Sequence, residues 1–496
     1  MRVLVANRGE IAVRLIRACR ELGWEAVAVF SEVDADKPHV REAHWAVPLG
    51  PAAPEASYLA VPRLLEVAKE LGCQAVHPGY GFLAENPAFA RAVQQAGLLW
   101  IGPSPETIEL LGAKTAAREL ATRLGVPTVP GTPPLEHPEQ ARAFAREVGY
   151  PILLKAVGGG GGKGMRVVRE EAALEESFLR AQEEGRAFFA DPRVYAEKLI
   201  EKPRHVEVQI LADRFGQVVH LGERECSLQR RHQKLLEEAP SVAVSPQLRS
   251  QLGEAAVALA KASGYTTAGT VEFLLAPDGR FYFLEVNTRL QVEHPVTEVV
   301  YGVDLAQWMM RLSAGEKLAL RQEELVPRGH GIECRIVAED PAQGFAPSPG
   351  RILLLREPAG PGVRVDSGIL EGCQVTLDYD PLLAKLIIWG ETREQALARL
   401  RRALGEYAIL GLATTLPLFE RLLDDRDFLA GEVHTGWLEE KLAGRFEEPE
   451  PLPVAVAAAL EAAGLGVVSP DPYSAAGELR AWREASRRRM LRGWGA

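Results

Sequence analysis

The sequence lacks the features of several large protein classes. No apolar run among its 496 residues reaches the ~18 residues that a membrane-spanning helix needs. The N-terminus starts with a short predicted strand and charged residues, and it has no apolar signal-peptide core. The formal net charge of −10 excludes a nucleic-acid binder that works through general positive charge. We therefore expect a cytoplasmic protein whose partners include neither a membrane nor a nucleic acid.

Cysteine and lysine are both scarce. The five cysteines lie far apart and form no Cys-x-x-Cys pair: Cys19, Cys73, Cys226, Cys334 and Cys373. This pattern argues against a disulfide framework or a structural zinc site and favours a reducing compartment; we interpret Cys226 as a packing residue. Arginine outnumbers lysine 45 to 12, so a lysine at a given position is informative. Five of the lysines lie in motifs described below: Lys114, Lys155, Lys163, Lys198 and Lys234.

The remaining composition is that of a globular protein, with 47% hydrophobic and 25% charged residues. At about 150 residues per domain, the length predicts roughly three domains. In the first hundred residues, predicted strands at 3–6, 26–30 and 75–76 alternate with helical patterns at 11–22 and 58–71. Such alternation is typical of a parallel, doubly wound sheet.

A glycine run interrupts the middle of the chain at Gly158, Gly159, Gly160, Gly161 and Gly162. It is not a phosphate-binding Walker A loop, because Gly164 stands where Ser or Thr must follow Lys163. The residues after it have strand character, so the run is better interpreted as a hairpin loop. Its backbone amides would close around phosphate oxygens, with Lys155 and Lys163 adding positive charge. The alternative is a flexible surface loop.

A pair of glutamates gives the most specific geometric prediction. Asp278 and Gly279 form a strong hairpin turn signal between two strand-like segments, 270–276 and 281–287. Counting outward from a two-residue turn places Glu272 directly opposite Glu285, with Asn287 on the same face. Facing carboxylates repel unless a cation lies between them, and this oxygen-rich set suits Mg²⁺ or Mn²⁺. The alternative is that both acids are solvated. The opposite face is expected to be packed by Phe273, Leu275, Leu284 and Val286.

Directly after this hairpin, Arg289, Gln291 and Glu293 alternate. An extended segment would project all three from one face, where the cation binds a small oxyanion and the carboxylate accepts its proton. A surface ion pair explains these residues equally well when they are considered alone.

Taken together, the motifs resemble biotin carboxylase, the ATP-grasp component of biotin-dependent carboxylases. They occur in the family's order at residues 6–12, 77–83, 155–162, 203–207, 229–234, 285–295 and 333–335. The resemblance implies an α/β and α+β multidomain fold. Its parts would be a doubly wound N-terminal domain (1–112), an ATP-grasp domain (113–330) with a mobile glycine-rich lid (about 131–203), a C-terminal domain (331–446) and a linker-like basic tail (447–496).

The resemblance also implies roles for individual residues. ATP would be bound by Lys114, Lys155 and Gly158 to Gly162 at the phosphates, by Glu197, Lys198 and Ile200 near the adenine, and by His205, Gln229 and His232 along the ribose side. Two Mg²⁺ or Mn²⁺ ions would be held by Glu272, Glu285 and Asn287. Bicarbonate would be held by Lys234, Arg289, Gln291, Glu293 and the backbone of Val292, and biotin would lie at Tyr80 and Arg335. The catalytic residues would be Glu293 as base, Arg289, Lys234 and Arg335.

Three details qualify these roles. Ile200 stands where leucine is usual in the family, which conserves an apolar contact, and Lys163 stands where arginine is usual, which keeps only the charge. Because His205 and His232 each sit near arginine in the sequence, we expect both to be neutral hydrogen-bonding groups.

The implied reaction is the ATP- and bicarbonate-dependent carboxylation of biotin through carboxyphosphate. No methionine adjoins a lysine, so a Met-Lys-Met biotinylation site is absent and we expect a separate biotin carboxyl carrier protein. The other expected partners are a second copy of the chain, forming a homodimer, and a carboxyltransferase subunit. An acetyl-CoA carboxylase of fatty acid biosynthesis is favoured, with propionyl-CoA, methylcrotonyl-CoA or pyruvate carboxylase as alternatives. Another ATP-grasp ligase, or an inactive ATP-binding scaffold protein, would share some of the motifs. The basic tail is either a docking element or a disordered remnant.

Overall fold

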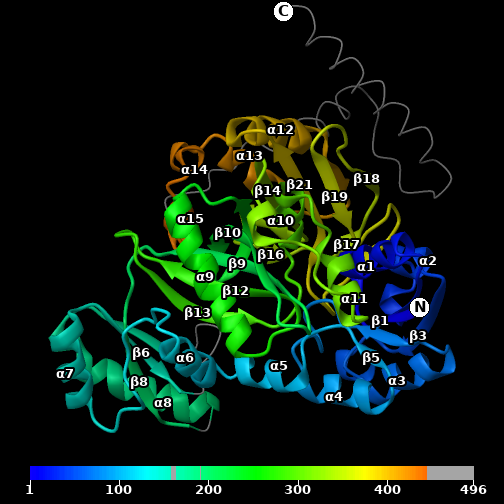
Figure 1. The fold of residues 1–496 in the computed structure, drawn as a ribbon. Helices are drawn as coiled ribbons and strands as arrows, with labels where there is room; N and C mark the ends of the chain where they lie inside the picture. Colours follow the sequence, from blue (N-terminus) through cyan, green and yellow to red (C-terminus); the bar gives the residue numbers. More distant parts are fainter. Residues whose placement is uncertain (158–163, 190, 444–496) are drawn as a thin grey trace, which may run out of the picture. The chain divides into compact units, whose positions relative to one another are not determined.

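The computed structural model describes residues 1–157, 164–189 and 191–443 (Figure 1). The chain divides into two units, residues 1–442 and 443–496. The glycine run at 158–162, Lys163 and the basic tail at 447–496 lie outside the described residues, so their predicted roles remain predictions. In the described part of the chain, no helix is long and apolar enough to span a bilayer.

The N-terminal region is built on a parallel sheet in the order β3-β2-β1-β4-β5. Its strands are β1 (Arg2–Val5), β2 (Glu25–Ser31), β3 (Trp45–Gly50), β4 (Ala75–His77) and β5 (Leu99–Trp100). Its helices are α1 (Gly9–Glu21), α2 (Pro38–Glu42), α3 (Val61–Glu70), α4 (Pro87–Gln95) and α5 (Pro105–Gly112).

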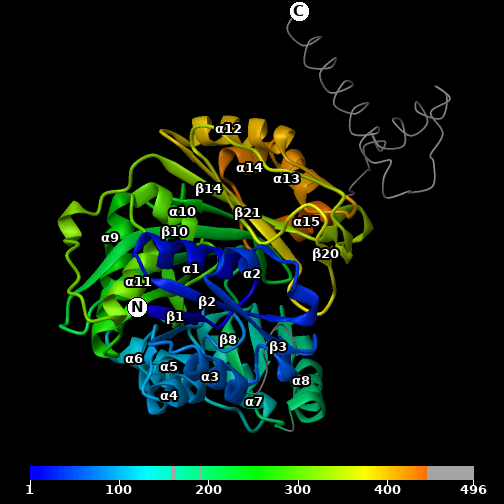
Figure 2. The same ribbon diagram turned by 90° about the vertical axis from the view of Figure 1, so that its right-hand side faces the viewer.

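Helices cover both faces of this sheet because successive strand residues point to opposite sides. Val3 and Val5 pack in one core cluster with Ile11 of α1, whereas Leu4 packs in another with Leu64 of α3. Figure 2 shows α1 and α3 on opposite sides of β1 and β2. The predicted doubly wound parallel sheet is confirmed.

Two motifs of this region are tied together at the carboxyl ends of β1 and β4. The Asn7 amide donates hydrogen bonds to the carbonyls of Pro78 and Tyr80, at 2.6 and 2.7 Å. Gly79 has a φ of +67°, and a Cβ there would lie 2.9 Å from Asn7 Nδ2. Glycine is therefore required at this close approach, which fixes Tyr80 beside the start of α1.

The predicted lid contains a small antiparallel sheet in the order β7-β6-β8. Its elements are β6 (Ile152–Ala156), β7 (Met165–Val168), β8 (Val194–Lys198), α7 (Pro138–Val148) and α8 (Leu174–Phe189). Ile152 pairs with Val168 and Lys155 pairs with Met165, so the strands flanking the glycine run form the predicted hairpin. Ile152, Val168 and Phe178 of α8 share one buried cluster.

The central sheet is antiparallel and runs in the order β13-β12-β9-β10-β11-β14-β21-β19. Its strands are β9 (Arg204–Ala212), β10 (Val218–Arg230), β11 (Gln233–Ala239), β12 (Thr267–Leu275), β13 (Phe281–Asn287), β14 (His330–Val337), β19 (Val363–Ser367) and β21 (Leu382–Gly390). Because β11 pairs with β14, this sheet continues across the boundary expected between residues 330 and 331.

Helices and short strand pairs surround this sheet. The helices are α6 (Lys114–Arg123), α9 (Pro246–Ala262), α10 (His294–Tyr301), α11 (Leu305–Ser313), α12 (Arg393–Glu406), α13 (Leu416–Leu422), α14 (Arg426–Ala430) and α15 (Trp437–Ala443). The short pairs are β15 (Glu339–Asp340) with β16 (Ala346–Pro347), β17 (Gly350–Arg351) with β20 (Gln374–Val375), and β18 (Leu354–Arg356) with β22 (Ala408–Leu410).

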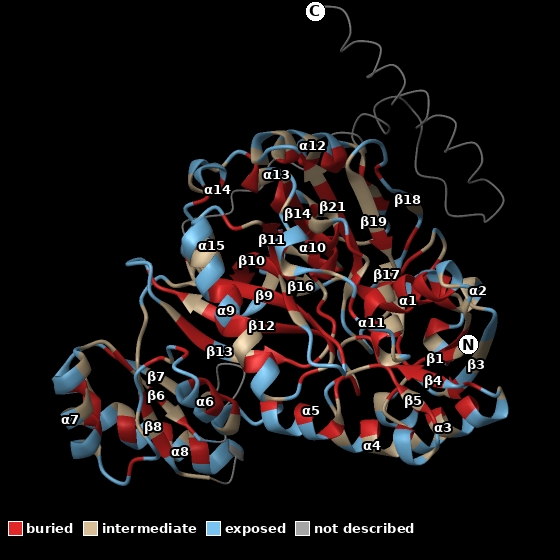
Figure 3. Cartoon of the chain, in the orientation of Figure 1, coloured by how far each residue is buried: buried red, intermediate tan, exposed pale blue. Residues whose placement is uncertain are grey.

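The two faces of the central sheet differ in chemistry. Val208 of β9 and Val271 of β12 pack with Leu259 of α9 in a buried apolar cluster. The alternate residues of the same strands, Glu207 and Glu272, point to the other face and are also buried. Figure 3 shows that buried residues run along these strands while the outer faces of the helices are exposed. One face is therefore a core, and the other is a floor of buried charge.

All five cysteines are free and buried. Burial raises the pKa of the Cys19 thiol to about 12 and that of Cys73 to about 11. Cys226 is fully buried in the central sheet, which agrees with its interpretation as a packing residue.

Candidate active site

A cavity of about 2090 Å³ lies over the charged face of the central sheet and reaches the N-terminal region and the lid. Every predicted site residue in the described part of the chain lines it: Tyr80, Lys114, Lys155, Glu197, Lys198, Ile200, His205, Gln229, His232, Lys234, Glu272, Glu285, Asn287, Arg289, Gln291, Val292, Glu293 and Arg335. The structure thus brings together side chains that are up to 255 positions apart (335 − 80).

The floor of the cavity contains a row of charges across four strands. Glu285 of β13 pairs with Glu272 of β12, which pairs in turn with Glu207 of β9. Glu207 also pairs with Arg224 of β10, and their side chains form an ion pair of 2.5 Å. Like charges directly opposite each other are destabilising, so this row needs cations above it.

The predicted pairing of Glu272 with Glu285 is confirmed, but the turn that produces it is different. The Ala276 amide donates to the Arg280 carbonyl at 2.8 Å, which closes a three-residue turn with Gly279 at a φ of +84°. The register then shifts by one residue between Glu272 and Phe273. The turn is one residue longer than predicted, and the bulge adds one residue to β13. Together these two differences restore the predicted register at Glu272 and Glu285.

The same bulge overturns one packing prediction. Leu284 is the residue left without a partner in the ladder, and it is 40% exposed rather than packed. The other three residues of the predicted apolar face, Phe273, Leu275 and Val286, are buried as expected.

Lys234 of β11 is the cation at the centre of the floor. Its ammonium lies 2.6 Å from Glu207, 2.9 Å from Glu272 and 2.7 Å from Glu293. Burial lowers the pKa of Lys234, but the three carboxylates outweigh it and hold the pKa well above its usual value. Lys234 therefore keeps its charge.

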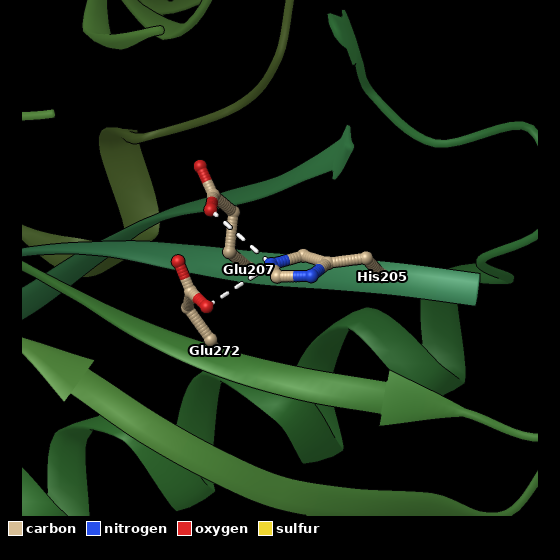
Figure 4. A group of neighbouring side chains, drawn as sticks. All are labelled: His205, Glu207 and Glu272. Carbon is tan, nitrogen blue, oxygen red and sulfur yellow. Dashed lines mark ion pairs between the residues drawn. The ribbon is translucent and has the colours of Figure 1, made fainter. Parts of the chain in front are cut away.

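His205 lies at the edge of the same cluster, as Figure 4 shows. Its Nε2 is 3.7 Å from Glu207 and 3.2 Å from Glu272. Burial lowers its pKa, but Glu272 and then Glu207 raise it to about 9. The expectation that His205 is neutral is wrong for this arrangement, because the sequence neighbour Arg204 points elsewhere, toward Glu225 and the Gly431 carbonyl.

Glu293 is buried between two cations. Lys234 contacts one of its oxygens, and Arg335 of β14 donates to the other at 2.9 Å. Arg335 also donates to Glu237 at 2.7 Å. Burial raises the pKa of Glu293, but Lys234 and Arg335 outweigh both this and the charge of Glu207, so its pKa lies below its usual value. Glu293 is therefore ionised and able to accept a proton.

Arg289 and Gln291 lie on the same irregular segment as Glu293. Arg289 donates to Asn287 and to Glu85, both at 2.9 Å. The Gln291 amide donates to Glu272 at 2.9 Å and its oxygen accepts from Arg224 at 2.8 Å. The segment is not a strand, but its alternating side chains still line one cavity, as predicted.

The lid end of the cavity is more open. Lys155 of β6 and Arg118 of α6 both donate to Glu197 of β8. Lys114 lies 3.7 Å from Glu285 on a side chain that is 76% exposed. Lys198 donates to the carbonyls of Gly149 and Tyr150. Among the described residues, Lys114 and Lys155 each have one ion-pair partner, so both ammonium groups can still donate to an anion.

The other predicted contacts lie around the same space. Ile200 packs with Val129 and Tyr282 in a small apolar cluster, which suits a flat apolar ring. Gln229 is buried, whereas His232 is exposed at a φ of +67°. At the N-terminal end, the Tyr80 hydroxyl donates to Glu10.

Glu272, Glu285 and Asn287 fit a hard divalent cation. All three offer oxygen atoms on one face of the hairpin, and the Asn287 amide donates to Glu272 at 2.8 Å. Burial and then the charge of Glu272 raise the pKa of Glu285, and the exposed Lys114 lies 3.7 Å away. A metal ion between the carboxylates would relieve this repulsion.

Sequence reasoning missed several residues of the site. Arg224 is fully buried and surrounded by its hydrogen-bond partners, which are Glu207, Gln209, Thr270, Gln291 and Thr297. Glu207 belongs to a recognised motif but had no predicted role, although it alternates with His205 on one strand, which is a usable signal. Glu85 accepts from Arg289 and Arg118 donates to Glu197, and neither Glu85 nor Arg118 was among the predicted site residues.

Family profiles match the chain in three consecutive parts. "Biotin carboxylase, N-terminal domain" matches residues 1–108, "Carbamoyl-phosphate synthase L chain, ATP binding domain" matches 113–321, and "Biotin carboxylase C-terminal domain" matches 333–440.

Individual relatives match at nearly full length. A pyruvate carboxylase subunit of Methanothermobacter thermautotrophicus is 49% identical over 444 residues, covering 89% of this chain and 90% of that protein. Biotin carboxylase of a Nostoc species is 50% identical over 440 residues, covering 88% and 98%. A crystal structure of the biotin carboxylase domain dimer of Hydrogenobacter thermophilus 2-oxoglutarate carboxylase, with MgADP, ADP and bicarbonate, has a TM-score of 0.84 and 47% identity, covering 90% and 99%. With the cavity described above, these matches show that the chain belongs to the biotin carboxylase family of ATP-dependent ligases.

Proposed function

We propose that this cavity carboxylates carrier-bound biotin with ATP and bicarbonate, with the residue roles that the family resemblance implies. The observation that carries the proposal is the position of Glu293, a buried ionised carboxylate whose two oxygens meet Lys234 and Arg335. The two cations can bind a small oxyanion, and the carboxylate beside them can accept its proton.

ATP occupies the lid end of the cavity. Lys114 and Lys155 contact the phosphates together with Gly158, Gly159, Gly160, Gly161 and Gly162. Glu197, Lys198 and Ile200 contact the adenine, and His205, Gln229 and His232 lie along the ribose side. The sparse pairing of the lysines at this end supports the assignment, because Lys155 and Lys114 can reorient toward phosphate oxygens.

Glu272, Glu285 and Asn287 would hold Mg²⁺ or Mn²⁺, two ions in the complete complex. The metal supplies charge neutralisation for the ATP phosphates when it is bound. The related 2-oxoglutarate carboxylase domain was solved with MgADP and bicarbonate, which supports both ligands here.

Bicarbonate is held by Lys234, Arg289, Gln291 and the backbone of Val292. Glu293 accepts the bicarbonate proton, and the freed oxygen forms a bond to the γ-phosphorus of ATP as the bond to the ADP oxygen breaks. The buried floor orients the nucleophile for this in-line attack and excludes water from the product, carboxyphosphate.

Biotin enters at Tyr80 and Arg335. Carboxyphosphate splits at its carbon–oxygen bond into CO₂ and phosphate, and the phosphate removes the N1′ proton of biotin. Arg335 stabilises the resulting enolate oxygen, and N1′ then forms a bond to CO₂. Arg335 can serve both stages, because it already contacts Glu293 from the biotin side.

The partners and the holoenzyme are further parts of the proposal. A biotin carboxyl carrier protein presents the biotin, and a carboxyltransferase subunit selects the acyl acceptor. We favour the acetyl-CoA carboxylase type in the cytoplasm, working as a homodimer. The relatives include a 2-oxoglutarate carboxylase domain dimer and a pyruvate carboxylase subunit, so co-purification of the transferase and identification of its substrate is the direct test. Deleting residues 470–496 and repeating that co-purification tests the tail as a docking element.

The reaction is tested by phosphate release from MgATP, with and without bicarbonate and free biotin. Release should require bicarbonate and rise with biotin. Release that ignores bicarbonate would overturn the proposal, a response to bicarbonate without any response to biotin would favour another ATP-grasp ligase, and no release at all would favour an inactive scaffold.

A further inference from the structure

Lys385 is a fully buried lysine that no part of the proposed mechanism uses. It lies on β21, where it pairs with Arg335 of β14 on one side and with Asp366 of β19 on the other. Its ammonium donates to the Val292 carbonyl at 2.9 Å. The side chain therefore reaches the backbone of the segment that carries the proposed base.

Two neighbouring cations hold two consecutive residues of this segment. Arg335 contacts the Glu293 side chain, and Lys385, its cross-strand neighbour, contacts the carbonyl of Val292. Like charges directly opposite each other across strands are destabilising, so this pair requires acidic partners. Arg335 has Glu237 in addition to Glu293, and Lys385 has Glu10 at 3.1 Å and Asp366 at 3.9 Å.

The acidic partner links Lys385 to the opposite side of the cavity. Glu10 belongs to the first turn of α1 in the N-terminal region, and its Oε1 lies 3.1 Å from the Lys385 ammonium. The same oxygen accepts from the Tyr80 hydroxyl, and the Lys385 ammonium lies 6.0 Å from the centre of the Tyr80 ring. One chain of contacts thus runs from Val292 through Lys385 and Glu10 to Tyr80.

We propose that Lys385 is a positioning residue that fixes the Val292–Glu293 peptide for bicarbonate and couples it, through Glu10, to Tyr80 at the biotin end. The inference rests on the proposed bicarbonate site. Lys385 touches no reacting atom; it sets the direction of a backbone whose neighbouring side chain is the base. A small displacement of that base is costly, because proton transfer and in-line attack both depend on its position.

The competing explanation is that Lys385 only neutralises Glu10 inside the fold. The two explanations differ when both charges are removed. Lys385→Met deprives the Val292 carbonyl of its donor and leaves Glu10 without its cation. Lys385→Met combined with Glu10→Gln removes one charge of each sign and leaves Asp366 paired with Arg364, but the carbonyl is still without its donor.

The experiment measures phosphate release against bicarbonate and against MgATP, together with Tm, for the wild type, Lys385→Met and the double variant. For Lys385→Met we expect the KM for bicarbonate to rise at least tenfold, with the KM for MgATP within twofold of the wild type. The double variant should recover Tm but keep the raised KM for bicarbonate. It also remains informative where the single variant does not fold, because its buried charges are balanced.

Arg249→Met is the matched control. Arg249 forms a largely buried ion pair with Glu223 at 2.6 Å, and neither residue lines the cavity. This variant should lower Tm without changing the KM for bicarbonate. An unchanged KM in Lys385→Met, its full recovery in the double variant, or an equal rise in Arg249→Met would overturn the inference. Bicarbonate-independent release by the wild type would instead overturn the proposed function itself.

Discussion

The end of the cavity around Lys234, where we propose that bicarbonate binds, and the lid end hold their charges in different ways. At the bicarbonate end, Lys234 contacts three carboxylates at 2.6 to 2.9 Å and is 13% exposed. At the lid end, Lys155 contacts only Glu197 among the ion pairs described, and its side chain is 24% exposed. The first arrangement is complete before any ligand binds, whereas the second leaves positive charge free to meet phosphate.

This difference agrees with the size and chemistry of the two ligands that we propose for these ends. Bicarbonate is small and makes few contacts, so its binding free energy cannot offset the entropy cost of ordering a loop. Its site therefore has to be preorganised within the sheet. ATP is large and brings its own negative charge, so its binding can complete the surroundings of Lys155 and Lys114. Substitutions at the two ends should therefore differ in their effects on bicarbonate turnover, nucleotide binding and stability.

Glu293→Gln should lower bicarbonate-dependent phosphate release by about 100-fold or more, the usual scale for loss of a general base. Binding of MgADP, measured by calorimetry, should change little, because Glu293 belongs to the bicarbonate end. Retained turnover would remove Glu293 as the base, and lost nucleotide binding would show that the two ends are not separable.

Lys234→Met should destabilise the protein by about 3–5 kcal/mol, because it leaves Glu207, Glu272 and Glu293 facing one another without their shared cation. The measurement is urea-induced unfolding at neutral pH. A loss below about 1 kcal/mol would mean that water reaches this floor and that the bicarbonate end is not preorganised.

Buried and exposed ion pairs should also differ in their contribution to stability in acid. Burial raises the pKa of Glu238, but hydrogen bonds from Arg393 and His330 outweigh it and lower the pKa to about 2. Because this folded-state pKa lies below the unfolded one, the ionised group contributes stability above about pH 4.5. That contribution, about 3 kcal/mol, is lost as the pH falls toward 2. Glu238→Gln should therefore remove part of the acid sensitivity seen in unfolding at pH 5 and pH 3.

Asp191 on the lid is the matched exposed case. A hydrogen bond from Arg193 lowers its pKa to about 2 as well, but the Arg193 side chain is 63% exposed and the Asp191 side chain 23% exposed, so water reaches the pair. Screening by water and salt makes such pairs weak, so Asp191→Asn should leave the acid sensitivity unchanged. Equal effects of the two variants would contradict the distinction between buried and exposed pairs.

Lys155→Met should have the smallest effect on stability, below about 1 kcal/mol, because Arg118 still pairs with Glu197. Its effect should fall on the KM for MgATP, which we expect to rise several-fold in the phosphate-release assay. A large loss of Tm would show that Lys155 is a structural cation like Lys234.

Local signals in the sequence were enough to predict the hairpin of the two glutamates and its flanking strands. The Asp278–Gly279 turn and the alternation around it place Glu272 opposite Glu285, and the structure has this pair. The turn length and the bulge at Leu284 were not predictable, because they depend on how the strand packs rather than on turn chemistry. The pair survived because the two deviations cancel.

Contacts between residues that are far apart in the sequence could not be predicted from local sequence patterns. Arg224 meets Glu207 only because β9 and β10 pair with a register shift, and Lys385 meets Glu10 from the far end of the chain. The prediction that His205 is neutral was wrong because it considered only sequence neighbours, whereas the carboxylate of Glu272, 67 residues away (272 − 205), lies beside the ring. Residue types at a site can be recognised from sequence, but the partners that set their protonation come from topology.

The burial of all five cysteines has a practical consequence for site-specific fluorescent labelling of the enzyme. Thiol reagents need an accessible thiolate, and burial denies both access and ionisation to these groups. A single cysteine introduced at the exposed hairpin tip, at Asp278, would therefore take up a fluorescent label selectively without first removing the native thiols. A dye there would sit on the same hairpin as Glu272 and Glu285, the residues proposed to hold the metal, and would report changes in that hairpin when ligands are added.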